Sequence, residues 1–431
     1  MKFESLIFAC LAVAVFFASG AGQPKANAEG APASVRFVRY DAGLPTSGQW
    51  REGFRIADMN GDGHPDIVHG PARKQAGPPV IFLGDGKGSW TRWKEARFPE
   101  LDYDYGDVEV ADFNRDGHMD IALAVHLHGF FVLTGDGKGN FQNASVGLDA
   151  TAGGPSGFSS RAIRAVDWNG DGLLDLVAIS EGLGSGSSRP LAERDGVVVF
   201  LNQGAKGWRR GERALSKGIY SDSITLGDFD GDGHLDVATG SSVMDRRDLV
   251  TLWRANGATA PLSLEFPGSH QFVQSVTAGD FDNDGKADLA VAYVSLENEV
   301  WYSALDLFYS RAGGKWERRG LFREATREGP LALASGHLLS KSARDLVALT
   351  ARGETLVFLA DGHGGLVRNT IPLPAYGGAC RGAHVELADL DGDGRDEIVA
   401  SFADEPAGFG AGANNCPSGG GITAWKAVVN R

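Results

Sequence analysis

The sequence predicts an all-β protein made of repeated, small antiparallel sheets, and three observations support this fold class. A nine-residue acidic motif recurs at intervals of 54, 55, 61, 52 and 109 residues. Short runs rich in Val, Ile, Leu and Phe flank each copy, as expected for strands rather than long helices. Glycine is abundant, with 61 residues that gather in turn-forming clusters. Such repetition outweighs the length of 431 residues as a guide to domain number.

The acidic motif is clearest in the segment 228–236, which reads DFDGDGHLD. Carboxylates at motif positions 1, 3, 5 and 9 can converge only if the backbone curls tightly, and the Gly at position 6 allows that curl. Oxygen donors packed this densely repel one another unless a cation lies between them. Calcium accepts six to eight oxygens in flexible geometry, so the motif predicts a calcium-binding loop.

Six copies of the motif are intact, and a seventh is degenerate. Loops 1 to 5 and loop 7 are the intact copies, at 58–66, 112–120, 167–175, 228–236, 280–288 and 389–397. The 109-residue interval is about twice the usual one and predicts a hidden unit, loop 6, at 337–345. His337, Leu339 and Lys341 replace three ligands there, and only Asp345 remains. We expect loop 6 to be metal-free, either because the Lys341 ammonium stands in for the ion or because the site was simply lost.

Each repeat shows the same order of predicted strands: one enters the loop, a second leaves it, and a third and an amphipathic fourth are joined by a Gly-rich turn. First strands are expected at 53–57, 108–111, 163–166, 224–227, 276–279 and 385–388, second strands at 66–68, 120–125, 175–179, 236–239, 288–293 and 397–402, and third strands at 79–83, 130–133, 197–201 and 355–359. Four antiparallel strands repeated seven times predict a seven-bladed β-propeller over residues 29–431. An open solenoid of the same units is the alternative.

The last repeat has only three strands of its own, which end near 421–428. We expect the segment 35–40, before the first repeat, to supply the missing outer strand and seal the ring. Three residues before loops 7, 1, 2 and 3 stand side chains of alternating charge, namely Glu386, Arg55, Glu109 and Arg164. On consecutive innermost strands these side chains either form a paired belt along the channel or point at unrelated solvent.

The beginning of the chain and its cysteines predict export to the periplasm or the extracellular space. Residues 1–28 combine Lys2, an apolar run and small residues before position 28, which is typical of a cleaved signal peptide. The apolar run is too short to span a bilayer, so we expect no membrane span. Cys380 and Cys416 remain after cleavage, and an even pair in an exported chain predicts a disulfide, with two free thiols as the alternative.

The net charge of −14 argues against nucleic-acid binding. Most of this negative charge comes from the carboxylates that are expected to bind metal ions. The six intact loops carry 21 carboxylates at positions 1, 3, 5 and 9. About six divalent ions would bring the net charge to roughly −2.

The loops, the period and the GDGKG turns at 84–88 and 135–139 resemble the FG-GAP/VCBS repeat family, the propellers of integrin α-chains and of many exported bacterial proteins. The resemblance covers nearly the whole mature chain and implies calcium ligands from the side chains at positions 1, 3, 5 and 9 and from the backbone carbonyl at position 7. These residues are Asp58, Asn60, Asp62, His64 and Asp66 in loop 1, Asp112, Asn114, Asp116, His118 and Asp120 in loop 2, Asp167, Asn169, Asp171, Leu173 and Asp175 in loop 3, Asp228, Asp230, Asp232, His234 and Asp236 in loop 4, Asp280, Asp282, Asp284, Lys286 and Asp288 in loop 5, and Asp389, Asp391, Asp393, Arg395 and Glu397 in loop 7.

The family says less about function, because its members include adhesion heads, carbohydrate-binding modules and some polysaccharide lyases. We expect a monomeric binding or adhesion module for a glycan or an extracellular protein, acting through the face opposite the acidic loops. Aromatic and His side chains at those connections are the candidate ligand contacts: Trp50, Tyr103, Tyr105, His126, Trp301 and Tyr302. No nucleophile elbow or HExxH motif is present, so no catalytic residue is assigned. A polysaccharide lyase with its site at the channel mouth is the alternative.

Overall fold

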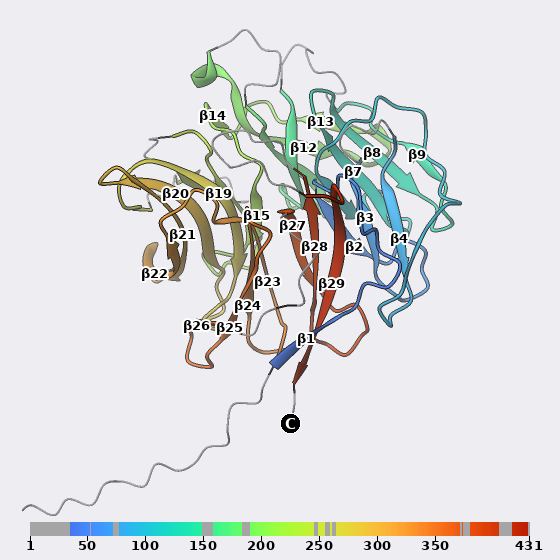
Figure 1. Ribbon diagram of the computed structural model, residues 1–431. Coiled ribbons are helices and arrows are strands. Elements are labelled where there is room, and N and C mark those ends of the chain that lie inside the picture. Colours follow the sequence, from blue (N-terminus) through green and yellow to red (C-terminus); the bar gives the residue numbers. More distant parts are fainter. Residues whose placement is uncertain are drawn as a thin grey trace, which may run out of the picture.

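Each predicted repeat folds into one antiparallel sheet in the computed structural model, and the described residues form seven such sheets (Figure 1). The structure describes residues 35–51, 53–71, 77–148, 158–182, 190–244, 249–254, 259–260, 264–370, 373, 380–404 and 416–429. The signal peptide expected at 1–28 lies outside these ranges. Besides strands, these ranges contain two short 3-10 helices, η2 (Leu191–Glu193) and η3 (Gly204–Lys206). They include no helix with the length and apolar character needed to cross a membrane.

The seven sheets, which we call blades 1 to 7, follow one another along the chain. Blade 1 contains β2 (Phe54–Ala57), β3 (Asp66–His69), β4 (Val80–Gly84) and β5 (Trp90–Arg92); blade 2 contains β6 (Val108–Ala111), β7 (Asp120–Val125), β8 (Gly129–Gly135) and β9 (Phe141–Asn143). Blade 3 contains β10 (Ser160–Val166), β11 (Asp175–Ser180), β12 (Asp195–Asn202) and β13 (Trp208–Arg210), with β14 (Ser216–Lys217) also on β12; blade 4 contains β15 (Ile224–Gly227), β16 (Asp236–Gly240), β17 (Val250–Trp253) and β18 (Thr259–Ala260). Blade 5 contains β19 (Ser269–Gly279), β20 (Asp288–Glu297), β21 (Val300–Arg311) and β22 (Lys315–Glu324); blade 6 contains β23 (Pro330–Gly336), β24 (Asp345–Thr350), β25 (Thr355–Ala360) and β26 (Leu366–Arg368). Blade 7 contains β27 (Arg381–Ala388), β28 (Glu397–Ala403), β29 (Gly420–Val429) and β1 (Val35–Arg39).

The first strands of successive blades contact one another in a closed circle. Strand β2 contacts β6, and the series continues through β10, β15, β19, β23 and β27, which contacts β2 again. The outer strand of blade 7 is β1, paired antiparallel with β29 so that Phe37 lies opposite Ala427. Figure 1 shows the blue strand β1 beside the red end of β29, close to the C-terminus. The fold is therefore a seven-bladed β-propeller, and its last blade takes its fourth strand from the beginning of the propeller.

The core is divided into seven clusters, and each one lies between two neighbouring blades. Between blades 7 and 1, for example, Leu390 and Ile422 pack against Phe54 and Trp90. The apolar residue at loop position 2 contributes to these clusters. It is almost fully buried in six of the seven loops, as Met59, Phe113, Phe229, Phe281, Leu338 and Leu390. Each loop is thus anchored in the interface between blades, which positions the acidic groups that follow.

Blade 5 has longer strands than the sequence patterns predict. The second strand, expected at 288–293, continues to Glu297 and turns directly into β21. Asn298 and Glu299 form this two-residue turn with φ of +48° and +65°. A two-residue turn with two positive φ values matches the twist of paired strands. Both strands can therefore continue up to the turn, and they are longer than the corresponding second and third strands of the other blades.

Candidate functional site

The six intact loops share one backbone conformation, which the glycine at position 6 makes possible. Its φ lies between +80° and +89° in all six, from Gly394 to Gly285. The N–H of this glycine donates to the aspartate at position 1, for example from Gly63 to Asp58 at 2.8 Å. The same bond recurs in loop 7 between Gly394 and Asp389 at 2.7 Å. The curl expected from the sequence is therefore present, and it is held by the first acidic side chain.

In loops 1, 2, 3, 5 and 6 the carboxylate at position 9 joins the loop to the third strand of its blade. Asp66 accepts the N–H of Met59 within the loop and the N–H of Gly84 on β4, both at 2.9 Å. Its side chain is fully buried. Burial, and more weakly the charges of Asp62 and Asp58, raises the pKa of Asp66 to about 7. Burial in the same way raises the pKa of Asp288 and of Glu397 to about 7. An ionised group at position 9 is therefore destabilised unless a cation lies near it.

Carboxylates converge closely in three of the loops. One oxygen from each of three residues lies within 4.8 Å of the others in loop 4, loop 5 and loop 7; the residues are Asp228, Asp230 and Asp236, then Asp280, Asp282 and Asp288, then Asp389, Asp391 and Glu397. Two of these side chains, Asp282 and Asp389, each keep a buried Oδ1 that accepts no hydrogen bond from the described residues. Clustered hard oxygens with an unused buried acceptor fit a divalent cation such as calcium. In loop 7, however, the Lys426 ammonium already contacts three of the carboxylates.

Loop 6 keeps the position 9 contacts of the other loops but lacks their acidic groups at positions 1, 3 and 5 and the positive φ at position 6. Asp345 accepts the N–H of Leu338 at 2.9 Å and that of Ala360 at 2.8 Å, which is the position 9 pattern. The Lys341 ammonium lies against Gly394 of loop 7, where a methyl group on that glycine would lie only 1.8 Å from Nζ. Lys341 thus reaches the next blade, which favours the simple loss of the site over a lysine in place of the ion.

The charged belt predicted from the strand pattern is present at the centre of the ring. Arg55 is buried and contacts Glu386 at 2.6 Å and Glu109 at 3.3 Å. Arg164 lies 3.9 Å from Glu109. Sequence reasoning missed Asp107, whose carboxylate lies 2.9 Å from Arg164 and 3.6 Å from Arg55. Asp107 stands outside the predicted strand, and no pattern in the sequence marks it.

A cavity of about 450 Å³ opens at the end of the channel opposite the acidic loops, and a narrower chamber of about 180 Å³ continues it toward the belt. Five arginines, two of them on β10, line the two chambers, namely Arg51, Arg161, Arg164, Arg327 and Arg381. Three carboxylates accompany them: Asp107, Glu181 and Asp222. The lining therefore carries a net positive charge of two, although the whole chain has a net charge of −14. We call these two chambers the channel mouth.

Part of the positive charge at the channel mouth is neutralised by ion pairs with neighbouring carboxylates. Arg161 contacts Asp222 at 2.9 Å and Glu181 at 3.3 Å. Arg327 instead stacks on the ring of Trp301, with its guanidinium carbon 4.3 Å from the ring centroid. The outer chamber also includes apolar side chains, among them Tyr220, Met244 and Phe272. The channel mouth thus combines fixed guanidinium groups with a partly apolar wall.

The six aromatic and His residues expected to contact a ligand are not brought together by the fold. None of them is part of the channel mouth lining among the described residues. Trp50 packs on His69 and Phe82 and donates to the Ser47 carbonyl, and Tyr103 packs on Phe131 and donates to the Pro99 carbonyl at 2.9 Å. Tyr105 stacks on His126, which bonds Glu181, while Trp301 and Tyr302 stack on Arg327 and Arg323. The six residues therefore lie at separate places: Trp50 and Tyr103 pack within their own blades, Tyr105 and His126 form one pair, and Trp301 and Tyr302 are neighbours on β21.

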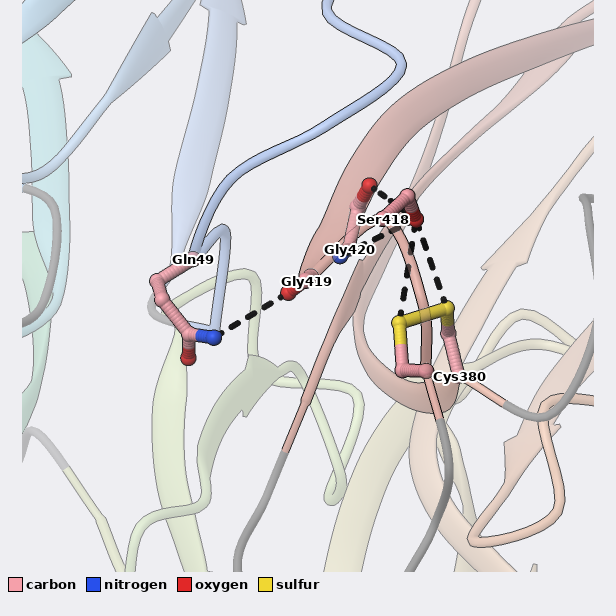
Figure 2. Close-up of a disulfide and its surroundings, with 6 residues drawn as sticks. Gln49, Cys380, Ser418, Gly419 and Gly420 are labelled. Carbon is pink, nitrogen blue, oxygen red and sulfur yellow. Dashed lines mark hydrogen bonds between the residues drawn. A yellow bond between two sulfur atoms is a disulfide. The ribbon is translucent and has the colours of Figure 1, made fainter.

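Cys380 and Cys416 form a disulfide, with their Cα atoms 4.6 Å apart (Figure 2). Both sulfurs are buried against blade 7. The segment after Cys416 is tied to the approach to blade 1, because Gln49 donates its side-chain N–H to the Gly419 carbonyl at 3.2 Å. The disulfide therefore lies beside the junction of the first and last blades.

Comparisons with known proteins agree with this architecture. Residues 58–123 match the model of the FG-GAP-like repeat, and residues 272–293 match that of the FG-GAP repeat. No curated protein matches the sequence. Two solved structures of BBS1N in complex with ARL6DN, soaked with lead and with mercury, are similar at 12% and 11% identity and TM-scores of 0.50 and 0.52. Each alignment covers 91% of this chain, and 95% and 97% of the other chain, and at this identity it concerns the fold alone. The two repeat matches, together with the recurring acidic loops and the seven blades, show that this chain contains FG-GAP repeats.

Proposed function

We propose that this protein is a calcium-stabilised binding module that takes an anionic partner at the channel mouth. The observation that carries the proposal is the group of five arginines in a strongly acidic protein, four around the outer chamber of about 450 Å³ and Arg164 in the inner one. Guanidinium groups bind carboxylates and sulfates through paired, charge-assisted hydrogen bonds. The cavity volume is typical of sites for small ligands.

An acidic glycan is the partner that this geometry favours. The outer chamber offers a partly apolar wall, with Tyr220 and Phe272, beside Arg161 and Arg381. Sugar rings present apolar faces together with charged substituents, so a uronic acid or sulfated sugar matches both features. An acidic loop of a protein partner is the second candidate, because the structurally similar BBS1N was solved in complex with a protein.

Export and calcium binding are parts of the same proposal. The disulfide between Cys380 and Cys416 supports an oxidising compartment, periplasmic or extracellular. Free calcium is high enough there to fill sites with Kd values of about 0.1 to 1 mM. The converging carboxylates of loops 4 and 5, with the unused Oδ1 of Asp282, support calcium as the ion.

Binding to an array of acidic and neutral glycans tests the proposal. We expect acidic glycans to be retained and neutral ones not, and retention to weaken at high salt because surface charges are screened. Arg327→Gln and Arg381→Gln should each reduce binding at least tenfold. Arg209→Gln is the matched control, because Arg209 lies on β13 at the outside of blade 3. Equal binding of neutral and acidic glycans, or full binding by both mouth variants, would reject the proposal.

A polysaccharide lyase with its site at the channel mouth is the alternative activity, favoured by Tyr220 and His384 in the lining. Burial, and the charge of Asp222, raises the pKa of Tyr220, so its hydroxyl would stay protonated at neutral pH. Incubation with uronic-acid polymers separates the two functions. New ultraviolet absorbance from an unsaturated product would support a lyase, and its absence together with retained binding would support the binding module.

A further inference from the structure

The six intact loops are not chemically equivalent at position 3. Loops 1, 2 and 3 carry Asn60, Asn114 and Asn169 there, and each amide donates to the aspartate at position 5 at 2.9 to 3.0 Å. Loops 4, 5 and 7 carry a further carboxylate instead, Asp230, Asp282 and Asp391. These three loops therefore hold one more negative charge than the first three.

Each additional carboxylate is paired with a basic side chain from its own blade. Asp230 contacts Arg254 at 3.0 Å, and Asp282 contacts Arg311 at 2.5 Å. Asp391 contacts the ammonium group of Lys426. The protein thus supplies one positive charge wherever position 3 is acidic, so an exchange of Asn for Asp leaves the local charge unchanged.

The strand register places two of these basic residues at one site in the blade. Lys426 follows Trp425, which pairs with Ile398, so Lys426 lies across from Glu397 at position 9. Arg254 follows Trp253, which pairs with Val237, and it lies across from position 9 of loop 4 in the same way. The matching residues in blades 1, 2 and 3 are Leu83, Thr134 and Leu201. A cationic side chain at this place is therefore confined to blades whose loops have an acidic position 3.

Lys426 differs from the arginines because its ammonium lies among the ligand groups themselves. Beyond Asp391 at position 3, Nζ lies 3.0 Å from Asp393 at position 5 and 3.2 Å from Glu397 at position 9. An ammonium group has three N–H donors, and three carboxylates surround it here. The side chain is only 19% exposed, and the ring of Tyr40 covers it with a centroid 5.9 Å away. The arginines contact fewer of the loop carboxylates: Arg254 pairs with Asp230, and Arg311 pairs with Asp282 and lies 3.9 Å from Asp284, while neither is paired with the position 9 carboxylate among the ion pairs of the described residues.

We propose that Lys426 is the resident cation of loop 7, so that this loop binds no calcium and the protein carries five ions rather than six. A divalent ion bound by Asp391, Asp393 and Glu397 would have to share three carboxylates with an ammonium a few ångströms away, and like charges at that distance repel strongly. The proposal rests on calcium binding by the other intact loops.

The location of the metal-free loop has a structural consequence. Blade 7 closes the ring through β1, and it also contains the disulfide. With a covalently attached cation in loop 7, none of the elements that close the ring depends on calcium. We expect calcium removal to loosen individual loops while the ring remains closed.

The calcium content of the folded protein tests the assignment. Native mass spectrometry of the calcium-loaded protein should show five ions in the wild type and six in Lys426→Gln. Arg254→Gln is the matched control and should remain at five. Six ions in the wild type, or five in a folded Lys426→Gln variant, would overturn the role of Lys426. A wild type that binds no calcium would instead refute the calcium proposal itself.

Hydrogen exchange of the wild type provides a second test that needs no variant. On addition of EDTA, amide exchange within 280–288 should rise at least tenfold, while exchange within 389–397 should change less than twofold. Equal loss of protection in both segments would show that loop 7 also depends on bound calcium, and would overturn the proposal even if Lys426→Gln does not fold.

Discussion

Replacement of Arg55 by Met should destabilise the propeller more than the loss of a surface arginine. Arg55 is 9% exposed and touches Glu386, Glu109 and Asp107 within 3.6 Å. Methionine fills a similar volume but carries no charge. The buried Asp107 and the partly buried Glu109 and Glu386, from blades 2 and 7, would then lie near one another, with Arg164 and His384 as the remaining basic partners in the contacts of the described residues.

The expected cost follows from the burial of this network. Removal of one partner from a buried ion pair typically costs about 3 to 5 kcal/mol, because the other charge stays buried without compensation. A chain of this size has an unfolding entropy of about 0.8 kcal/mol per kelvin, so a loss of about 4 kcal/mol lowers Tm by about 5 °C. Arg352→Met is the control. Arg352 pairs with Glu324 and Glu328 but is 40% exposed, and such pairs contribute about 0 to 1 kcal/mol.

The pH dependence provides an independent check. Burial opposes ionisation of Asp107, but Arg55 and Arg164 together hold its pKa below the usual value. Burial opposes ionisation of Glu386 as well, and Arg55 and His384 lower its pKa. Stability from a lowered carboxyl pKa is complete above the unfolded pKa of about 4 and is lost as the pH falls through the folded pKa.

Thermal melts of both variants in calcium buffer should therefore show a gap between Arg55→Met and the wild type that is largest near pH 7. The gap should shrink below about pH 4, where the carboxylates of the belt take up protons. A Tm for Arg55→Met equal to that of Arg352→Met at pH 7 would refute the reasoning, as would a gap that widens in acid.

Three further outcomes are expected. EDTA should lower Tm by many degrees and added calcium should restore it, since each site filled at ten times its Kd contributes about 1.4 kcal/mol; an unchanged melt would argue against structural calcium. Replacement of Cys380 and Cys416 by Ser should cost about 4 kcal/mol in chemical denaturation, the chain-entropy value for a separation of 36 residues, and a cost below about 1 kcal/mol would contradict it. Tyr293→Phe should cost about 1 to 3 kcal/mol, because the buried Asp306 loses a 2.8 Å hydrogen bond, whereas Tyr302→Phe, whose ring stacks on Arg323, should be nearly neutral.

Much of the fold could be predicted from the sequence because its causes are local. The curl of each loop needs only the glycine at position 6 and the aspartate at position 1, and both are contiguous in the chain. The strands on either side follow from short apolar runs, and β6, β7 and β15 begin and end where the pattern predicts. Even the belt of Arg55, Glu109 and Glu386 could be predicted. Each of these residues stands three positions before its loop, so the first strands place them at the same level of the ring.

The channel mouth could not be predicted in the same way. Trp50, Tyr103 and Trp301 were reasonable candidates by residue type, yet each packs within its own blade or against a nearby arginine. The channel mouth is instead lined by arginines that are hundreds of residues apart, such as Arg51 and Arg381. No local pattern marks them, because they meet only when the ring closes.

The sequence by itself determined that this chain repeats a loop of the calcium-binding type and forms a ring of small sheets. Glycine conformation and strand alternation act over a few residues, and the repeat period can be read directly along the chain. Only the tertiary structure decided which charges meet. Lys426 is 29 residues after the end of loop 7, and the register of β28 and β29 alone brings its ammonium to Asp391 and Glu397. Charge pairing depends on distance in space, and distance in space across a sheet is set by register and closure rather than by order along the chain.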